Sequence, residues 1–177
     1  MADHLSEILE PDYLGALGDR PLPEVRAMRD RCQQVEGGLS YVRRLAHGRL
    51  DIVGGELARR REGGDPGDLS ALVQRLPELL TDAGDSARVQ RSPRRVELGD
   101  ASTDLEAELD AIAPVDDLAD LIDLDADGLQ ALADRLVVFE RTVSDRRRRV
   151  HERIDTLQAE IARRYRDGEA SIESVLD

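Results

Sequence analysis

The sequence predicts an all-α fold in which two long helices form an antiparallel coiled coil, with short helices and a flexible linker between them. The first observation is the composition, because 36% of the 177 residues are charged and only 2% are aromatic. A chain with so few bulky side chains suits long helices packed along narrow apolar seams better than a compact globule. The second observation is that residues 21–62 and 128–168 carry apolar side chains in alternating steps of three and four, the heptad spacing of a coiled coil. The seams alone are compatible with either relative direction of the two helices.

The N-terminal part of the chain divides into an acidic arm, residues 1–20, and the first coiled-coil helix, residues 21–62. The arm contains an apolar-acidic stretch, residues 5–17, that can form a short helix or remain disordered. Pro21 and Pro23 fit the first turn of the long helix, where proline is tolerated. The predicted seam, less strict after residue 46, is Val25, Met28, Cys32, Val35, Leu39, Val42, Ala46, Leu50, Val53 and Leu57.

The central part, residues 63–127, is predicted to consist of linker and short acidic helices. Its candidate helices cover residues 68–80, 102–112 and 115–122, and a linker covers residues 82–99.

The second coiled-coil helix, residues 128–168, is followed by a tail, residues 169–177. Asp127 is a good N-cap for this helix, and Gly168 is expected to end it. The predicted seam is Leu129, Leu132, Leu136, Phe139, Val143, Val150, Leu157 and Ile161.

The two long helices are copies of one another, because residues 24–61 align without a gap on residues 128–165 when the chain is shifted by 104 positions. The seams coincide in this alignment, and 14 of the 38 aligned positions are identical. Surface positions of a coiled coil are free to vary, so identical polar residues indicate a common role. Five of them recur with the spacing Glu-x3-Ser-x2-Arg-x3-His-x3-Asp. They form the first stripe (Glu36, Ser40, Arg43, His47 and Asp51) and the second stripe (Glu140, Ser144, Arg147, His151 and Asp155).

Each stripe lies on one side of its helix. At 100° per residue its members fall within an arc of about 80° along roughly 22 Å of helix, about 90° from the apolar seam. When the two seams pack, the stripes can therefore line one polar groove. If the helices are antiparallel, a local twofold axis relates the stripes, and the groove suits a ligand that has twofold symmetry of its own.

The residue types in the stripes suit a nucleotide. The arginines offer planar forks for phosphate oxygens or for the O6/N7 edge of guanine, and the serines can donate to phosphate. Carboxylates can accept hydrogen bonds from guanine N1–H and N2–H2, and the stripes contain four of them: Glu36, Glu140, Asp51 and Asp155. The competing interpretation is a solvated helix face with i,i+4 ion pairs. One copy of the stripe would favour that interpretation, whereas two copies in matching phase favour a ligand site.

Two other classes of function fit the sequence less well. A ligand-free coiled-coil adaptor or scaffold would not need a duplicated polar stripe. A metal site could use the i,i+4 pairs His47/Asp51 and His151/Asp155, but the arginine next to each pair opposes a cation, and metal sites in bundles usually show Glu-x-x-His. No catalytic triad, phosphate loop or cysteine cluster is evident in the sequence, so we expect neither an enzyme nor a metalloprotein.

The formal net charge of −13 bears on the partners of the chain. Phosphate repulsion opposes direct nucleic-acid binding, whereas a basic protein is a suitable partner. The segment from Glu97 to Asp134 contains thirteen acidic residues and no Arg. Cys32, the single cysteine, falls on the seam and is expected to be a core residue. Because the N-terminus has no signal-peptide pattern and no apolar run approaches a membrane span, we expect a cytoplasmic protein without membrane contact.

The duplicated stripe resembles the cyclic di-GMP signature of the RsiG anti-sigma factors of actinobacteria, Glu-x3-Ser-x2-Arg-x3-Gln-x3-Asp, which that family carries on both helices of a coiled coil. Four of the five positions match in each copy, and His47 and His151 stand where the family has Gln. Histidine can also donate and accept hydrogen bonds. The resemblance implies that the ten stripe residues bind a dimer of cyclic di-GMP. It also implies that the loaded protein sequesters the sporulation sigma factor WhiG, a relative of flagellar sigma factors, in a heterodimer.

Overall fold

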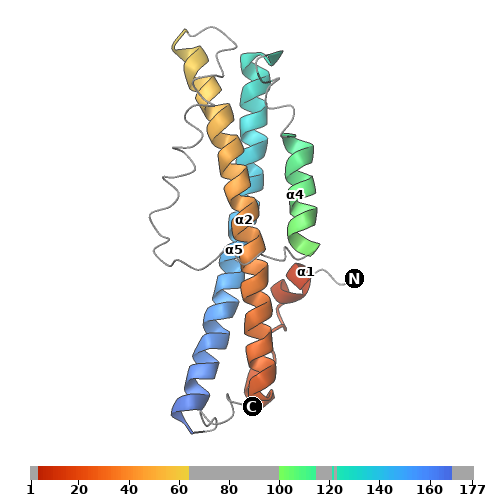
Figure 1. The fold of residues 1–177 in the computed structure, drawn as a ribbon, viewed down its shortest axis with the longest axis vertical. Coiled ribbons are helices and arrows are strands. Elements are labelled where there is room, and N and C mark those ends of the chain that lie inside the picture. The colour runs from red at the N-terminus through yellow and green to blue at the C-terminus, as the bar shows by residue number, and fades with distance from the viewer. Residues whose placement is uncertain (1–3, 64–99, 115–120, 122, 169–177) are drawn as a thin grey trace, which may run out of the picture.

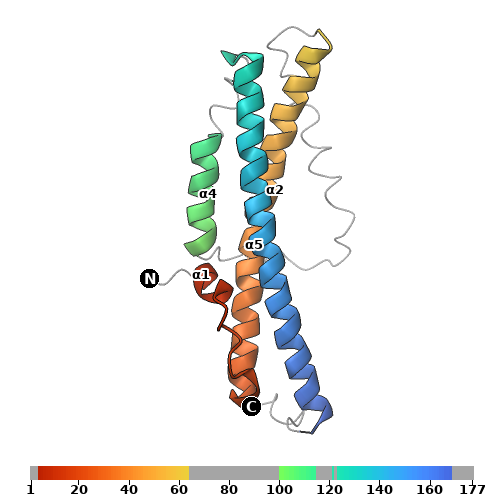
Figure 2. The same ribbon diagram turned by 180° about the vertical axis from the view of Figure 1, so that it is seen from behind.

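The computed structural model describes residues 4–63, 100–114, 121 and 123–168, and every regular element in these ranges is helical. The elements are α1 (His4–Leu9), the 3-10 helix η1 (Leu17–Asp19), α2 (Leu22–Arg61), α4 (Asp100–Ile112) and α5 (Ala126–Arg166). Figure 1 shows α2 and α5 side by side along the length of the molecule, and Figure 2 shows the same pair from behind. The predicted all-α fold with two long paired helices is confirmed.

The helices α2 and α5 run antiparallel. In Figure 1 the first turns of α2 and the last turns of α5 lie at the same end of the molecule. Arg60, near the C-terminal end of α2, donates to the carbonyl oxygen of Leu124, just before α5 begins. Arg164, near the C-terminal end of α5, donates to the carbonyl oxygen of Arg20, just before α2 begins. Contacts at both ends therefore establish the direction that the seams had left open.

The interface between α2 and α5 forms most of the core. Apolar residues recur on both helices every three or four positions, so the two seams remain in contact over the length of the pair. The buried seam residues are Val25, Met28, Cys32, Leu39, Val42, Ala46, Val53, Leu129, Leu132, Leu136, Phe139, Val143, Val150, Ile154, Leu157 and Ile161. Burial raises the pKa of the Cys32 thiol, which agrees with its prediction as a core residue.

Three predicted seam residues of α2 are only partly buried: Val35, Leu50 and Leu57. Arg49 and Glu56 are buried instead. The alternating steps of three and four continue strictly through these two charged positions, whereas the sequence prediction had moved to the next apolar residue. A buried charge needs a partner, and both residues have one.

The start of α5 differs from the prediction. Its N-cap is Asp125, whose side chain accepts a hydrogen bond of 2.7 Å from the backbone N–H of Gly128. The predicted N-cap, Asp127, is wrong, because this residue lies within the first turn of the helix. Its negative charge is still favourable there, next to the positive end of the helix dipole. Two nearby aspartates suit the same helix start, and only the backbone geometry decides which of them caps it.

The shorter predicted elements have different outcomes. The helix predicted at residues 102–112 is present as α4, and the N-terminal arm forms α1 and η1. The predicted helix at residues 68–80, the linker at 82–99 and the tail at 169–177 lie outside the described residues. The helix predicted at 115–122 also lies outside them, except for residue 121, which has a 3-10 helical conformation.

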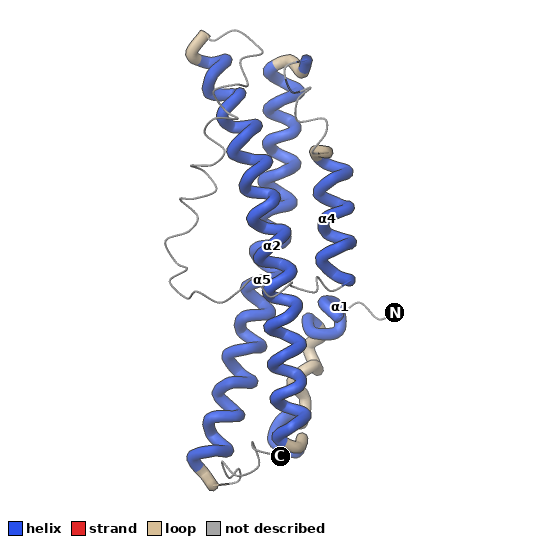
Figure 3. The backbone as a smooth tube through the Cα atoms, viewed as in Figure 1, coloured by secondary structure: helices blue, strands red, loops and turns tan. Residues whose placement is uncertain are grey.

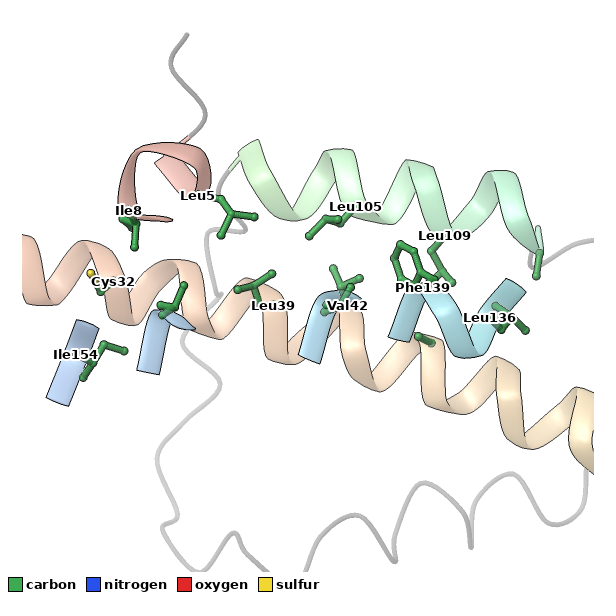
Figure 4. Packing of buried hydrophobic residues seen from close by; sticks show 14 of the residues in the cluster. Leu5, Ile8, Cys32, Leu39, Val42, Leu105, Leu109, Leu136, Phe139 and Ile154 are labelled. Carbon is green, nitrogen blue, oxygen red and sulfur yellow. The ribbon is translucent and has the colours of Figure 1, made fainter. Parts of the chain in front are cut away.

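Helices α1 and α4 follow one another along one side of the long pair (Figure 3). Leu105 and Leu109 of α4 point towards the long helices and join their apolar cluster (Figure 4). At Gly38, α4 comes close to α2, because a Cβ atom built on this glycine would lie 3.1 Å from the Cβ atom of Ser102. The absence of a side chain at Gly38 therefore permits the close packing of α4.

The stripes lie on the opposite side of the helix pair from α1 and α4. Glu36 and Gly38 are two residues apart and hence about 200° apart around α2. On α5, Arg149 donates to the carbonyl oxygen of Leu9 at the end of α1, and it lies about 180° around the helix from Glu140. One side of the pair is thus covered by short helices, and the other carries the stripes. None of the helices described here combines the length and the apolar character needed to cross a membrane.

Candidate functional site

The two stripes face each other across the seam, and the first of two polar clusters between them centres on Glu36. The Oε1 atom of Glu36 accepts a hydrogen bond of 2.6 Å from Ser40 on the same helix. It also accepts one of 2.8 Å from Nε of Arg147, and it lies 3.1 Å from Nε2 of His151, both on the opposite helix. The Nε atom of Arg147 lies 2.8 Å from the Ser40 hydroxyl as well. The glutamate of the first stripe is therefore bound by the arginine and the histidine of the second stripe.

The second cluster repeats this arrangement around Glu140. Its Oε1 atom accepts a hydrogen bond of 2.7 Å from Ser144 on the same helix. From the opposite helix it accepts one of 3.1 Å from Nε of Arg43 and lies 3.1 Å from Nε2 of His47. The same four residue types thus meet twice, with the two helices exchanged. This is the local twofold relation expected of antiparallel stripes.

Both glutamates are partly buried and remain ionised. The side chains of Glu36 and Glu140 are 20% and 16% exposed. Burial by itself would raise the pKa of each carboxyl group, but hydrogen bonds from serine and arginine, with the nearby histidine and arginine charges, outweigh it. The pKa of each carboxyl group is therefore lowered. Each cluster combines one carboxylate with one guanidinium group, so their charges largely balance.

The guanidinium groups are held at one nitrogen atom only. Arg43 and Arg147 are 39% and 33% exposed and donate through Nε. Their terminal Nη atoms form no hydrogen bond with any residue that the structure describes. Each arginine thus retains a planar fork of N–H donors, which matches phosphate oxygens or the O6/N7 edge of guanine.

Asp51 and Asp155, the last residues of the stripes, are exposed. Within the described ranges neither forms a hydrogen bond or an ion pair. The structure therefore brings eight of the ten predicted site residues into two clusters and leaves both aspartates outside them. Two carboxylates with unoccupied oxygens can accept the paired N–H donors of a base.

Each stripe histidine contacts the glutamate of the opposite helix. His47 contacts Glu140 on the other helix, not Asp51 four residues further along. In the part of the chain that is described, no group of three or more His, Cys, Asp and Glu side chains is arranged to hold a metal ion. The arrangement suits recognition of an anionic, hydrogen-bonding ligand.

A second pair of clusters lies at the ends of the helix pair and was not predicted. At the end of α2, Glu56 accepts hydrogen bonds from Arg59 and Arg60. Arg60 also donates to the carbonyl oxygens of Leu121, at 3.0 Å, and Leu124, in the turn that precedes α5. These hydrogen bonds, that from Arg59 first, lower the pKa of Glu56 in spite of its burial. We call this cluster the first end clamp.

The second end clamp has the same composition at the end of α5. Glu160 accepts hydrogen bonds from Arg163 and Arg164, which lower its pKa to about 2. Arg164 donates to the carbonyl oxygens of Leu17, at 2.8 Å, and Arg20, at 2.6 Å, in the turn that precedes α2. The signal was present in the sequence, since Glu-x2-Arg-Arg recurs at the offset of 104 residues. Only the antiparallel pairing shows that each copy holds the start of the other helix.

Comparison with known proteins agrees with the resemblance carried by the stripes. The family model for RsiG-like proteins matches residues 11–80 and 115–177, which include both long helices and both stripes. The matched ranges leave out α1 and α4. A comparison with curated proteins finds no match. The chain therefore belongs to the RsiG-like family, and this membership indicates an anti-sigma role with a sigma factor as partner.

Proposed function

We propose that this chain binds cyclic di-GMP between its two stripes and, in the loaded state, sequesters a sigma factor of the WhiG or flagellar type. The observation that carries the proposal is the twofold arrangement of two equal sets of ligand-binding groups. Each set contains a partly exposed arginine and an aspartate, and neither side chain uses all of its hydrogen-bonding groups within the described residues.

The ligand matches this arrangement in symmetry and in chemistry. Cyclic di-GMP has twofold symmetry, two guanine bases and one negative charge on each of two phosphates. The forks of Arg43 and Arg147 can donate to phosphate oxygens or to guanine O6 and N7. Asp51 and Asp155 can accept from guanine N1–H and N2–H2. Binding as a dimer, as the resemblance implies, would place a pair of bases near each end of the stripes.

The partner is supported by family membership and by charge. A sigma factor uses basic surfaces to engage promoter DNA, and this chain has a net charge of −13. The acidic residues of α4, Asp104 and Glu108 among them, are exposed and available to such a surface. Ligand can promote the complex only if it binds the sigma-competent form of the helix pair more tightly than the other forms. We place this one-to-one complex in the cytoplasm.

Calorimetric titration of the full chain with cyclic di-GMP tests the ligand. Cyclic di-AMP is the matched control, because adenine has no N1–H or N2–H2 donors for the aspartates. We expect at least about 100-fold weaker binding of the adenine compound, since its bases would leave carboxylates unpaired. Equal affinities for the two dinucleotides would show that the aspartates do not read the base.

A sizing column with a purified sigma factor of this type tests the switch. The complex should form with cyclic di-GMP and fail to form without it. By reciprocity, the sigma factor should tighten dinucleotide binding by the same factor by which the dinucleotide tightens the complex. A complex that forms equally well without ligand would favour an adaptor that is independent of cyclic di-GMP.

A further inference from the structure

The four stripe carboxylates divide into two kinds by their contacts. In each glutamate, the Oε1 atom already accepts hydrogen bonds from serine and arginine and lies 3.1 Å from a histidine nitrogen. In each aspartate, neither oxygen forms a hydrogen bond or an ion pair with the described residues. A guanine edge presents two adjacent N–H donors, and a carboxylate needs both of its oxygens to accept them. The aspartates meet this requirement and the glutamates do not.

We propose that Glu36 and Glu140 are positioning residues, each of which orients the ligand-binding arginine of the opposite helix. The inference rests on the proposed function, since it assigns roles within the same groove. Glu36 holds Arg147, and Glu140 holds Arg43. The ability of each arginine to bind the ligand then depends on a carboxylate of the opposite helix. That carboxylate is 111 residues away in sequence for Arg147 and 97 residues away for Arg43.

The physical reason is the geometry of the guanidinium group. This group is planar, so a charge-assisted hydrogen bond at Nε fixes the plane in which the two Nη atoms lie. A long arginine side chain would otherwise lose rotamer entropy when a ligand ordered it. The bond to glutamate orders the side chain before the ligand arrives, while the terminal Nη atoms form no hydrogen bond with the described residues. Pre-organisation of this kind increases affinity without any contact between the glutamate and the ligand.

The histidines extend the same arrangement. His151 contacts the glutamate that holds Arg147, and His47 contacts the glutamate that holds Arg43. Arginine and histidine of one stripe therefore share one carboxylate of the other. Neutralising that carboxylate should disturb the arginine on the opposite helix and leave the arginine on its own helix unchanged.

A double-mutant cycle tests this crossed dependence. We expect Glu36→Gln to weaken cyclic di-GMP binding by about tenfold, the size of effect seen when a partner that orients a ligating group is removed. In the double variant Glu36→Gln/Arg147→Lys, the loss of affinity for cyclic di-GMP should be about fivefold smaller than the product of the losses in the two single variants. Combined with Arg43→Lys, the losses should multiply. Lysine keeps the charge and a measurable affinity but lacks the Nε–H and the fork.

The matched control is Glu152→Gln, which removes an exposed carboxylate of α5 away from the stripe and should leave affinity unchanged. A readout without ligand accompanies the cycle. In nitrogen NMR spectra, the Nε–H signal of Arg147 should move in Glu36→Gln while that of Arg43 stays in place. A purely structural role of Glu36 would move neither signal selectively.

The outcomes separate this inference from the proposed function. A wild-type chain that gives no heat with cyclic di-GMP rejects the proposed function and the positioning role together. A wild-type chain that binds, but whose Glu36→Gln variant couples equally to both arginines or to neither, rejects the positioning role alone. Coupling to Arg147 only, with the matching NMR shift, supports it.

Discussion

The two sides of the helix pair differ in how far equivalent residues of the internal repeat make equivalent contacts. On the stripe side, corresponding residues of the two copies make corresponding contacts, as Glu36 and Glu140 do. On the other side they do not. Arg49 forms an ion pair with Asp110 of α4, whereas its counterpart Arg153 donates to the backbone carbonyl of Glu10 after α1.

The difference indicates where symmetry is maintained by the fold. At the stripes and the end clamps, a residue of one copy meets the other copy or the turn that leads into it, so both copies experience equivalent surroundings. On the covered side, each copy meets a different appended helix, and nothing requires equality. Gly38, which permits the close approach of α4, corresponds to the exposed Thr142 in the second copy. The family match has the same division, since it includes the stripes and leaves out α1 and α4.

The largest effect is expected on the symmetric side. Arg43→Ala and Arg147→Ala should each weaken cyclic di-GMP binding by more than about 100-fold, because a charge-assisted, two-point contact is lost. The two losses should be equal within error, and the helical circular dichroism should be preserved. The control is Arg44→Ala, which removes an exposed arginine next to Arg43 that has no partner among the described residues. Clearly unequal losses for the two arginines would contradict a twofold site.

On the side covered by α1 and α4, substitutions of the equivalent residues Arg49 and Arg153 are expected to change the stability by different amounts. Arg49 is 7% exposed in its side chain, and Arg49→Ala should lower the free energy of unfolding by about 1–2 kcal/mol. The loss is limited because one buried Nη atom of Arg49 has no hydrogen-bond partner in the described structure. Arg153→Ala should cost about 0.5 kcal/mol or less, since this residue makes one hydrogen bond near the surface. Urea denaturation of both variants measures the two changes in the free energy of unfolding. Equal changes would contradict the proposed difference between the two copies on the covered side.

The end clamps should make stability depend on acid pH. The pKa of Glu56 and of Glu160 is lowered in the folded state, and that of Glu160 falls from 4.5 to about 2. Their contribution is therefore present above pH 4.5 and is lost at lower pH, for Glu160 as the pH falls from 4.5 towards 2. The glutamates are 1% and 14% exposed, but Arg59 and Arg163 reach the surface at 21% and 41%, so we expect about 1 kcal/mol per clamp. In thermal unfolding, the double variant Glu56→Gln/Glu160→Gln should lose less stability than the wild type as the pH falls over this interval. Identical pH profiles of the two proteins would contradict a stabilising role of the end clamps.

The smallest effect distinguishes two neighbouring glycines of α2. Gly37→Ala should stabilise the protein by about 0.5–1 kcal/mol, because alanine favours the helix and the new Cβ atom would have no neighbour within 4 Å. Gly38→Ala should gain less or become destabilising, since its Cβ atom would lie 3.1 Å from that of Ser102 on α4. The difference between the two variants in thermal unfolding measures the packing of α4. A gain at Gly38 equal to that at Gly37 would show that α4 moves away without cost.

Much of the candidate site follows from helical periodicity. The spacing from Glu36 to Asp51 places all five residues on one side of a helix next to an apolar seam, and the same spacing in the second copy places the other five in the same way. The different contacts of the stripe glutamates and the stripe aspartates could not be predicted from the sequence. Glu36 and Asp51 have similar chemistry and the same orientation on the helix, and they differ only in what the opposite helix brings to them.

The sequence was sufficient for the two long helices, most of their seams, the repeat and the stripes, because each of these depends on local spacing along one chain segment. The tertiary structure decided the antiparallel direction, the crossed pairs of Glu36 with Arg147 and of Glu140 with Arg43, and the burial of Arg49 and Glu56. These features depend on the register of residues that lie about 100 positions apart. Register is set by the packing of whole helices and by the clamps at their ends, and no local pattern encodes it.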